Sequence, residues 1–354
     1  MNKQKLKELN KSVAPYAKPD NTRAIKQLIN TVLPFLILWY LAYQSLSISV
    51  WLAIPTAMLA GGFVIRLFII FHDCTHQSFT NHKKANRIIG TITGIITLFP
   101  FEKWKREHNV HHATSGNLDK RGTGDIWAMT IDEYLAASFW GKLKYRLYRN
   151  PIVMFGLGPI FLFLVANRFN DKGVKRKEKI NTYITNGTIA GIYALLIWAI
   201  GWEAFLIVNL PILYVSGVLG IWLFYVQHQF EDSYYEHDDE WEFVRAAVDG
   251  SSFYKLPKVL QWVSGNIGYH HVHHLSPRVP NYNLQDAHDS TPPLQHVTTI
   301  TLKTSLESLR FRLYDTSNKT FVSFKDVKHL LKDSSAIDRA KVMMNTSSPS
   351  FQDK

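Results

Sequence analysis

The chain has 354 residues, with 40 lysines and arginines against 28 aspartates and glutamates, which gives a formal net charge of +12. One cysteine excludes a disulfide framework and a four-cysteine metal site within a single chain. Apolar residues make up 46% and aromatic residues 13% of the chain, which excludes a protein that is disordered throughout. The charges are unevenly distributed, and their distribution indicates how the chain is organised.

Residues 1–27 are polar and basic, which is not typical of a cleavable signal peptide. We expect them to form a basic cytosolic arm lying on anionic lipid. No Asp, Glu, Lys or Arg occurs between Lys26 and Arg66, and these 39 residues would extend about 59 Å as helix, enough for two membrane crossings. A polar run near the middle supplies a tight reversal, so residues 28–71 are expected to form a helical hairpin.

Residues 180–230 repeat this pattern, interrupted only by Glu203, and predict a second transmembrane hairpin. Two shorter charge-free stretches, residues 88–101 and 150–167, have basic residues on both sides. A crossing there would place positive charge on both faces of the membrane, so interfacial or re-entrant packing is expected, with spanning as the alternative. Arg66, inside the first hairpin, is expected to snorkel to the headgroups, or alternatively to pair with a buried carboxylate.

The segments that carry most of the positive charge are expected to be cytoplasmic, and the two short connectors to face the outside. The prediction is an all-α, multi-pass protein of the plasma membrane with four transmembrane helices, and with both termini and a histidine-bearing helical part in the cytoplasm. Basic clusters that flank apolar spans also argue against nucleic acid as a partner. The oligomeric state is not predicted. The remaining parts expected are a cytosolic or interfacial part (72–179), a second cytosolic part (231–332) and a disordered tail (333–354).

Histidines are concentrated in three short strings, 72–76, 108–112 and 270–274. Their spacings are i,i+4 once and i,i+3,i+4 twice, which on a helix place the imidazoles on one face. An H-x-x-H-H string arises by chance in about one of forty chains of this length, and this chain has two. We therefore expect these histidines to bind metal.

The three strings and His228, at the end of the fourth span, are all assigned to the cytoplasmic side. One first-row metal ion accepts four to six ligands, so nine imidazoles exceed one site and suffice for two. By residue type alone, imidazole suits zinc, copper, iron and nickel alike. The nine candidate ligands are His72, His76, His108, His111, His112, His228, His270, His273 and His274.

Three acidic residues near the strings, Asp73, Glu107 and Glu231, are expected to accept hydrogen bonds from the outer imidazole N–H groups. For Asp73, an exposed carboxylate on the helix surface is the alternative. The histidines without a partner at ligand spacing are expected at the surface. These are His82, His237, His288, His296 and His329.

Three segments extend the pattern beyond the histidines: Phe71–Phe79, His111–Trp127 and Gly265–Pro277. With them the sequence resembles the membrane-bound fatty-acid desaturases, and within that family the acyl-lipid branch that includes delta-five desaturases. The resemblance implies a non-haem diiron oxidoreductase that uses O2 and two electrons to introduce a cis double bond, here at the delta-five position, into acyl chains of membrane phospholipids. It implies that the nine histidines above are the iron ligands and that His271 is not one.

Two further implications concern the metal surroundings and the electron supply. Phe224 stands where animal acyl-CoA relatives carry an asparagine that binds metal through water, so no such tenth ligand is expected. The 27-residue arm is too short for a fused haem-binding domain and no His-Pro-Gly-Gly string occurs, so the electrons are expected from an external, acidic ferredoxin or flavodoxin.

A Gly-rich loop after the second string contains Lys120, Arg121 and Trp127. We expect the basic pair to contact lipid phosphate and Trp127 to line the acyl channel, with a solvated loop as the alternative. Two other functions stay open: a diiron hydroxylase or ketolase, which would use the same histidines, and a membrane metal transporter. A transporter would need ligating groups inside the spans, where this sequence has almost none.

Overall fold

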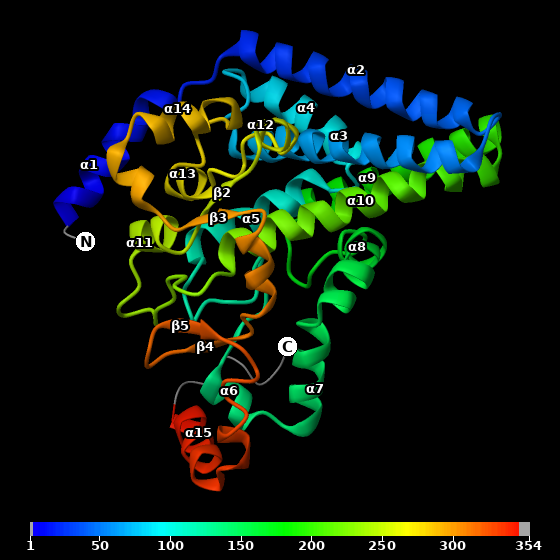
Figure 1. Ribbon diagram of the computed structural model, residues 1–354. Coiled ribbons are helices and arrows are strands. Elements are labelled where there is room, and N and C mark those ends of the chain that lie inside the picture. Colours follow the sequence, from blue (N-terminus) through cyan, green and yellow to red (C-terminus); the bar gives the residue numbers. More distant parts are fainter. Residues whose placement is uncertain (1–2, 347–354) are drawn as a thin grey trace.

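The computed structural model describes residues 3–346. Four helices are long and apolar enough to cross a membrane, and they lie side by side in one bundle (Figure 1). They are α2 (Asn21–Ser45), α3 (Val50–His76), α9 (Arg176–Ile200) and α10 (Trp202–His228). The prediction of four transmembrane helices is confirmed. Because 56% of the apolar window of α3 is buried, against 11% for α9, α3 forms the core of the bundle.

The first helix of the bundle begins at Asn21, earlier than expected, because the Asp20 side chain accepts hydrogen bonds from the backbone N–H groups of Thr22 and Arg23. The predicted reversal lies at residues 46–49. Ser49 caps α3 by accepting a hydrogen bond from the Trp51 N–H. Local hydrogen bonding at both ends thus sets the length of the first hairpin.

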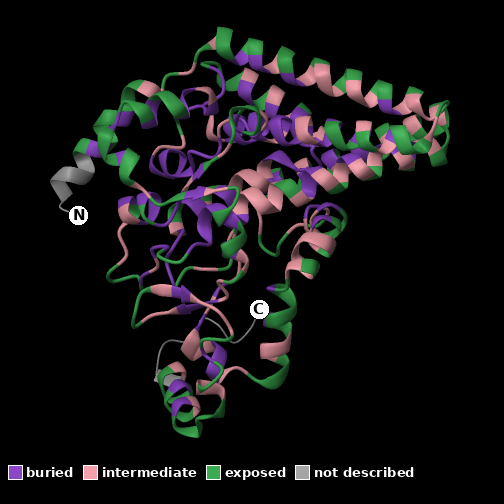
Figure 2. Ribbon diagram, viewed as in Figure 1, coloured by how far each residue is buried: buried purple, intermediate pink, exposed green. Residues whose placement is uncertain are grey.

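Shorter helices form a globular end beside α3 and α10, and buried residues are concentrated next to α3 and α10 (Figure 2). The shorter helices are α1 (Lys3–Val13), α4 (Lys83–Ile96), α5 (Phe101–Thr114), α6 (Ile131–Ala136), α7 (Phe139–Tyr148), α8 (Gly158–Phe161), α11 (Phe243–Val248), α12 (Lys258–Val263), α13 (His270–Leu275), α14 (Leu284–Asp289) and α15 (Ser334–Thr346). Of these, α6, α7 and α15 lie farthest from the bundle (Figure 1).

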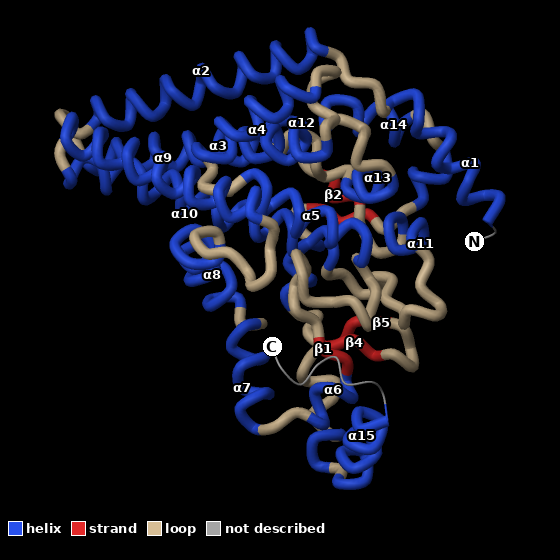
Figure 3. Tube along the Cα trace, turned by 180° about the vertical axis from the view of Figure 1, so that it is seen from behind, coloured by secondary structure: helices blue, strands red, loops and turns tan. Residues whose placement is uncertain are grey.

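Five short strands join the globular end, seen from behind in Figure 3. The strand β4 (Leu313–Asp315) pairs in parallel with β1 (Met129–Thr130) and antiparallel with β5 (Thr320–Val322). A separate parallel pair joins β2 (Phe253–Lys255) to β3 (Thr299–Thr301). These strands tie loops together, and the fold remains the predicted helical one.

The stretch 150–167 continues α7 as a helical segment, Val153–Ala166, that is bent by 64° relative to α7. Such a bend is what a re-entrant loop or a broken span shows. Residues 88–101 form most of α4 and the turn into α5, where Gly90 lies against Phe101 and Cys74. The helix α4 of the globular end therefore packs against the part of α3 that contains Cys74.

In the expected basic arm, Leu9 and Val13 lie in the same buried cluster as Val272 and Leu275 of α13, so this side of α1 is anchored to the globular end. Two expectations are wrong. The tail is not disordered over 334–346, because α15 buries Ala336 and Ala340 in a cluster with Leu135 of α6, while residues 347–354 lie outside the described part.

The second concerns Arg66, which does not snorkel and has no carboxylate partner among the described residues. Its guanidinium is buried, where it donates to the Thr31 hydroxyl and the Trp262 carbonyl oxygen and lies 4.0 Å from the centre of the Trp262 ring. A hydroxyl, a backbone carbonyl oxygen and an aromatic ring thus stabilise the buried guanidinium without a carboxylate.

The helices α3 and α10 approach each other closely at Gly61, where an added Cβ would lie 2.9 Å from the Ile212 carbonyl oxygen. We expect Gly61→Ala to lower the free energy of unfolding by about 1–3 kcal/mol, because the two helices must move apart. Gly191→Ala in α9 is the matched control, since nothing lies within 4 Å of its added Cβ. Thermal unfolding in detergent measures both, and equal stability of the two variants would contradict this account of the helix contact.

Candidate metal centre

Four helices end or turn at one place and bring the histidine strings together. His72 and His76 occupy the last turn of α3, which stops at Gln77 in a left-handed conformation (φ 60°). The second string lies on α5 and the third forms α13, while His228 is the last residue of α10. The helical spacing predicted from the sequence is therefore present in each string.

The nine histidines separate into two groups, in each of which one ligand atom per residue lies within 4.8 Å of all the others. The first group has five members and the second has four, and eight of the nine histidines are buried. The first group is His72, His76, His108, His112 and His273, and the second is His111, His228, His270 and His274. Each group can hold a metal ion.

The hydrogen bonds of the outer ring nitrogens show why a cation fits. His111 Nδ1 lies 2.5 Å from the Asp125 carboxylate and His228 Nδ1 lies 3.1 Å from the Gly250 carbonyl oxygen. Both acceptors require a hydrogen on Nδ1, so both Nε2 atoms present lone pairs. Those two Nε2 atoms face each other at 3.2 Å, an arrangement that a cation between them would stabilise.

The first group repeats this geometry. His72 Nδ1 lies 3.0 Å from Asp73 Oδ1, and its Nε2 lies 2.9 Å from His273 Nε2. His76 Nε2 is buried without a hydrogen-bond partner among the described residues. Burial, followed by the neighbouring imidazoles, holds the pKa values of His108, His112, His273 and His274 well below the usual histidine range. The rings are thus neutral, which is the state that binds metal.

Of the three acidic residues expected beside the strings, only Asp73 accepts a histidine N–H. Its other oxygen accepts hydrogen bonds from the Asn281 backbone and side-chain amides, at 2.6 and 2.8 Å. Glu107 instead pairs with Arg106 and Lys103, and Glu231 is exposed. Those two predictions are wrong because sequence proximity to a histidine does not fix which way a carboxylate points.

Asp125 is the functional residue that the sequence reasoning missed. It lies in the Gly-rich loop after the second string, and the neighbouring Gly124 has a φ of 74°. A Cβ on Gly124 would lie 2.9 Å from the Glu107 carbonyl oxygen and 3.0 Å from His111 Cβ. Gly124 therefore lets the loop lie directly on α5, which brings Asp125 to His111. The glycines of this loop, and its place in the segment His111–Trp127 that carries the family resemblance, were the signals available in the sequence.

Among the remaining histidines, His288 is buried, contrary to expectation. Its Nδ1 lies 3.0 Å from Nε2 of His271, which belongs to neither metal-binding group, as predicted. Burial lowers the pKa of His271 to about 3. The pair supports α13 from the side away from the metal centre. The other four histidines expected at the surface are exposed: His82, His237, His296 and His329.

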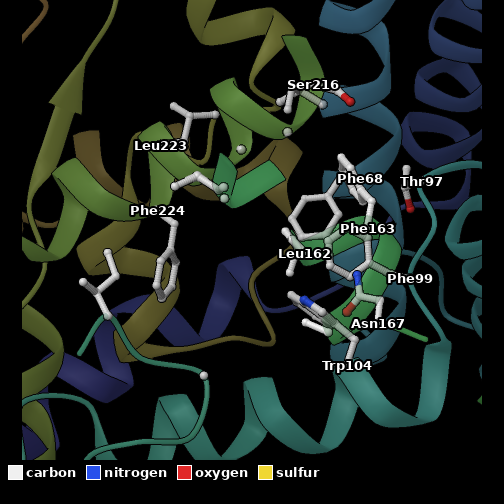
Figure 4. A pocket seen from close by; sticks show the side chains of 18 of the residues that line it. Phe68, Thr97, Phe99, Trp104, Leu162, Phe163, Asn167, Ser216, Leu223 and Phe224 are labelled. Carbon is white, nitrogen blue, oxygen red and sulfur yellow. The ribbon is translucent and has the colours of Figure 1, made fainter. Parts of the chain in front are cut away.

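A cavity of about 600 Å³ extends from the metal centre between α3, α5, α8 and α10 (Figure 4). Its walls are almost entirely apolar, and they reach His72 and His108 of the first group and His270 of the second. Phe224 lines the cavity, with its ring centre 5.1 Å from that of His111 and 5.2 Å from that of His228. A long apolar chain in this cavity would lie against both groups.

The three residues expected to bind substrate are not among those that line the cavity. Lys120 pairs with Asp238 at the surface, and Arg121 pairs with Glu133, with 3.0 Å between Nη1 and Oε2. Trp127 stacks edge-on against Tyr145, 5.0 Å between ring centres, beside the lining residue Ile126. Both basic residues are thus engaged by carboxylates of the chain itself.

We expect Asp125→Asn to weaken metal binding at the second group about tenfold or more, because it removes the negative charge from the oxygen that orients His111. Metal content after dialysis against a graded chelator would show the loss. Asp119→Asn, which changes an exposed carboxylate paired with the exposed His237, is the control and should retain full metal content. Equal retention by both variants would rule out this role of Asp125.

Comparison with known proteins agrees with this geometry. Residues 49–299 match the family model for fatty acid desaturases. The chain is 59% identical to a fatty acid desaturase of Bacillus subtilis, over 92% of this chain and 93% of that protein. It is 28% identical to a chloroplastic omega-6 fatty acid desaturase of Arabidopsis thaliana, over 77% of this chain and 59% of that protein. It is also 28% identical to an sn-1 oleoyl-lipid 12-desaturase of Picosynechococcus, over 70% of this chain and 72% of that protein. The chain therefore belongs to the fatty acid desaturase family, membrane-bound oxidoreductases that act on acyl lipids.

Proposed function

We propose that this protein is an O2-dependent desaturase that introduces a cis double bond into acyl chains of membrane phospholipids, with two iron ions as its metals. One observation carries the proposal: a single apolar cavity reaches histidines of both metal-binding groups. An acyl chain inside it would have its methylene groups next to the metal centre and mostly apolar side chains around the rest of its length.

The nine histidines would hold the two ions, five residues around one and four around the other. Once bound, the iron pair would supply the activation of dioxygen that abstraction of two hydrogens from a methylene chain requires. Phe68, Trp104 and Phe224 line the cavity and would hold the acyl chain still (Figure 4). The apolar walls would also exclude water, which protects the reaction from side products.

We place the double bond at the delta-five position because the sequence resembles delta-five acyl-lipid desaturases. The names of the relatives include omega-6 and 12-desaturases, and the name of the Bacillus subtilis relative gives no position. The position is therefore an assignment that lipid analysis must test.

We infer that the electrons come from an acidic ferredoxin or flavodoxin. A relative from Synechocystis, 27% identical over 69% of this chain, is named as an omega-3 desaturase with ferredoxin in its name. The basic segments would attract such a partner and are consistent with a plasma-membrane protein whose termini and metal centre face the cytoplasm. The transporter alternative is disfavoured, because both histidine groups lie at the ends of α3 and α10.

The activity can be tested by expressing the protein in a bacterium that lacks this double bond and locating double bonds in its lipids by mass spectrometry. We expect new cis-monounsaturated phospholipids with the unchanged protein and none with His111→Ala. His82→Ala, which alters an exposed histidine, should act like the unchanged protein. Hydroxylated chains in place of unsaturated ones would contradict desaturation and favour the hydroxylase alternative.

The metal assignment predicts about two iron ions per chain after anaerobic iron loading. His274→Ala leaves three ligands in the second group, whereas His76→Ala leaves four in the first. We therefore expect His274→Ala to lose about one ion and His76→Ala to keep most of its iron. Iron determination with protein quantitation measures both. The same loss from both variants would contradict the division into five and four.

A further inference from the structure

Two arginines outside the metal centre lie together without a carboxylate partner in the described part of the chain. Arg149 is fully buried. Its Nη2 donates to Gln229 Oε1 and to the Phe311 carbonyl oxygen, both at 2.8 Å, and its Nη1 donates to the Trp127 carbonyl oxygen at 3.2 Å. All of these acceptors are neutral.

Arg312 approaches the same point from the loop before β4. The Tyr225 hydroxyl oxygen lies 3.0 Å from Arg312 Nη1 and 3.4 Å from Arg149 Nη2, and it donates its own hydrogen to the Ser308 carbonyl oxygen at 2.9 Å. Two positive charges thus share one neutral oxygen. Arg121, in the same part of the fold, has a carboxylate partner in Glu133. Arg149 and Arg312 differ from it in that their hydrogen-bond acceptors are neutral.

The same place also lacks hydrogen-bond acceptors. Arg149 Nε and Gln229 Nε2 are both buried donors without a partner among residues 3–346. A buried donor without an acceptor is unfavourable, and buried charges are normally paired. Two guanidinium groups and an amide group thus lie together with more donors than acceptors, a donor set that an oxyanion with several acceptor oxygens would satisfy. Guanidinium groups bind phosphate particularly well, because their donors match its geometry.

This arginine cluster, defined as Arg149, Arg312, Gln229 and Tyr225, borders the substrate cavity. Two members of the cluster and one of its contacts directly follow cavity-lining residues in the sequence: Arg149 follows Tyr148, Tyr225 follows Phe224, and Trp127 follows Ile126. The preceding residues are all part of the cavity wall. In addition, Gln229 follows His228 of the second metal-binding group. Arg312 is only partly buried, so the cluster can be reached from its side.

We propose that Arg149, Arg312 and Gln229 bind a phosphate group, namely the headgroup phosphate of the phospholipid whose acyl chain occupies the cavity. This inference rests on the proposed function. The sequence predicts that Lys120 and Arg121 contact the lipid phosphate, but both form ion pairs with carboxylates of the chain. Arg149 and Arg312 take that role in this proposal. A headgroup held beside His228 would place the carboxyl end of the acyl chain near the metals, which favours a double bond close to that end.

The test measures binding, which does not require turnover. Purified full-length protein in detergent is titrated calorimetrically with dihexanoyl phosphatidylglycerol and, separately, with dihexanoylglycerol, which lacks the phosphate. We expect Arg312→Gln to weaken binding of the phosphatidylglycerol about tenfold, equivalent to about 1.4 kcal/mol. Binding of the neutral lipid should not change. Arg312→Lys, which keeps the charge, should retain most of the affinity.

The matched control is Arg310→Gln, which removes the same charge from an exposed arginine two residues away and should bind like the unchanged protein. Gln229→Glu provides a second variant should Arg312→Gln not fold. It places a carboxylate beside Arg149 and should abolish the preference for the phosphorylated lipid, because the carboxylate replaces the missing anion.

Unchanged phosphatidylglycerol affinity in both Arg312→Gln and Gln229→Glu would overturn the proposal. If Arg312→Gln lowered the affinity for both lipids equally, the proposal would also be overturned, because the arginine would then act only on the fold. Inorganic phosphate that binds in the same range as phosphatidylglycerol would assign the site to free phosphate and not to a headgroup. If binding depended on the phosphate as expected but the activity test found no new double bond in the lipids, the proposed function would be contradicted and the phosphate site would stand.

Discussion

The structure depends on nine imidazoles gathered at one place, eight of them buried, several of which face one another with their Nε2 atoms. His111 and His228 are each fixed by an outer hydrogen bond that leaves Nε2 as an acceptor, and the two acceptors lie 3.2 Å apart. Without cations this arrangement is repulsive, whereas the proposed cations would link α3, α5, α10 and α13. Metal binding would then be coupled to folding of the globular end, and the surrounding packing serves to hold these rings in place.

The position of the metal centre follows from the bundle. Its histidines lie at the ends of α3 and α10, where spans meet the globular end, and not within the apolar interior. The cavity continues from that level between the same helices. An acyl chain can thus remain in apolar surroundings while its carboxyl end stays near polar groups. The proposed phosphate site at the arginine cluster would place the anchored headgroup close to the position where the chain would be oxidised.

Residues that take no part in the chemistry set this geometry through tertiary contacts. Asp73 joins His72 to the Asn281 amides, so the first string is bound to the loop after α13. Gly124 allows the loop that carries Asp125 to lie on α5. Arg66 connects α3 to the Trp262 carbonyl oxygen in α12. Each contact joins segments far apart in the sequence, which explains how four separate strings of residues can share two small sites.

The sequence by itself determined the four apolar helices and the nine histidines, because hydropathy and the 3.6-residue helical period act within one segment. Only the tertiary structure decided the division of the histidines into five and four, the choice of Asp125 over Glu107 and Glu231, and the burial of His288. It also decided that residues 334–346 form a helix, since Ala336 and Ala340 need α6 to cover them. These outcomes depend on which segments meet, and the direction of a side chain is fixed only when its neighbours from elsewhere in the chain are in place.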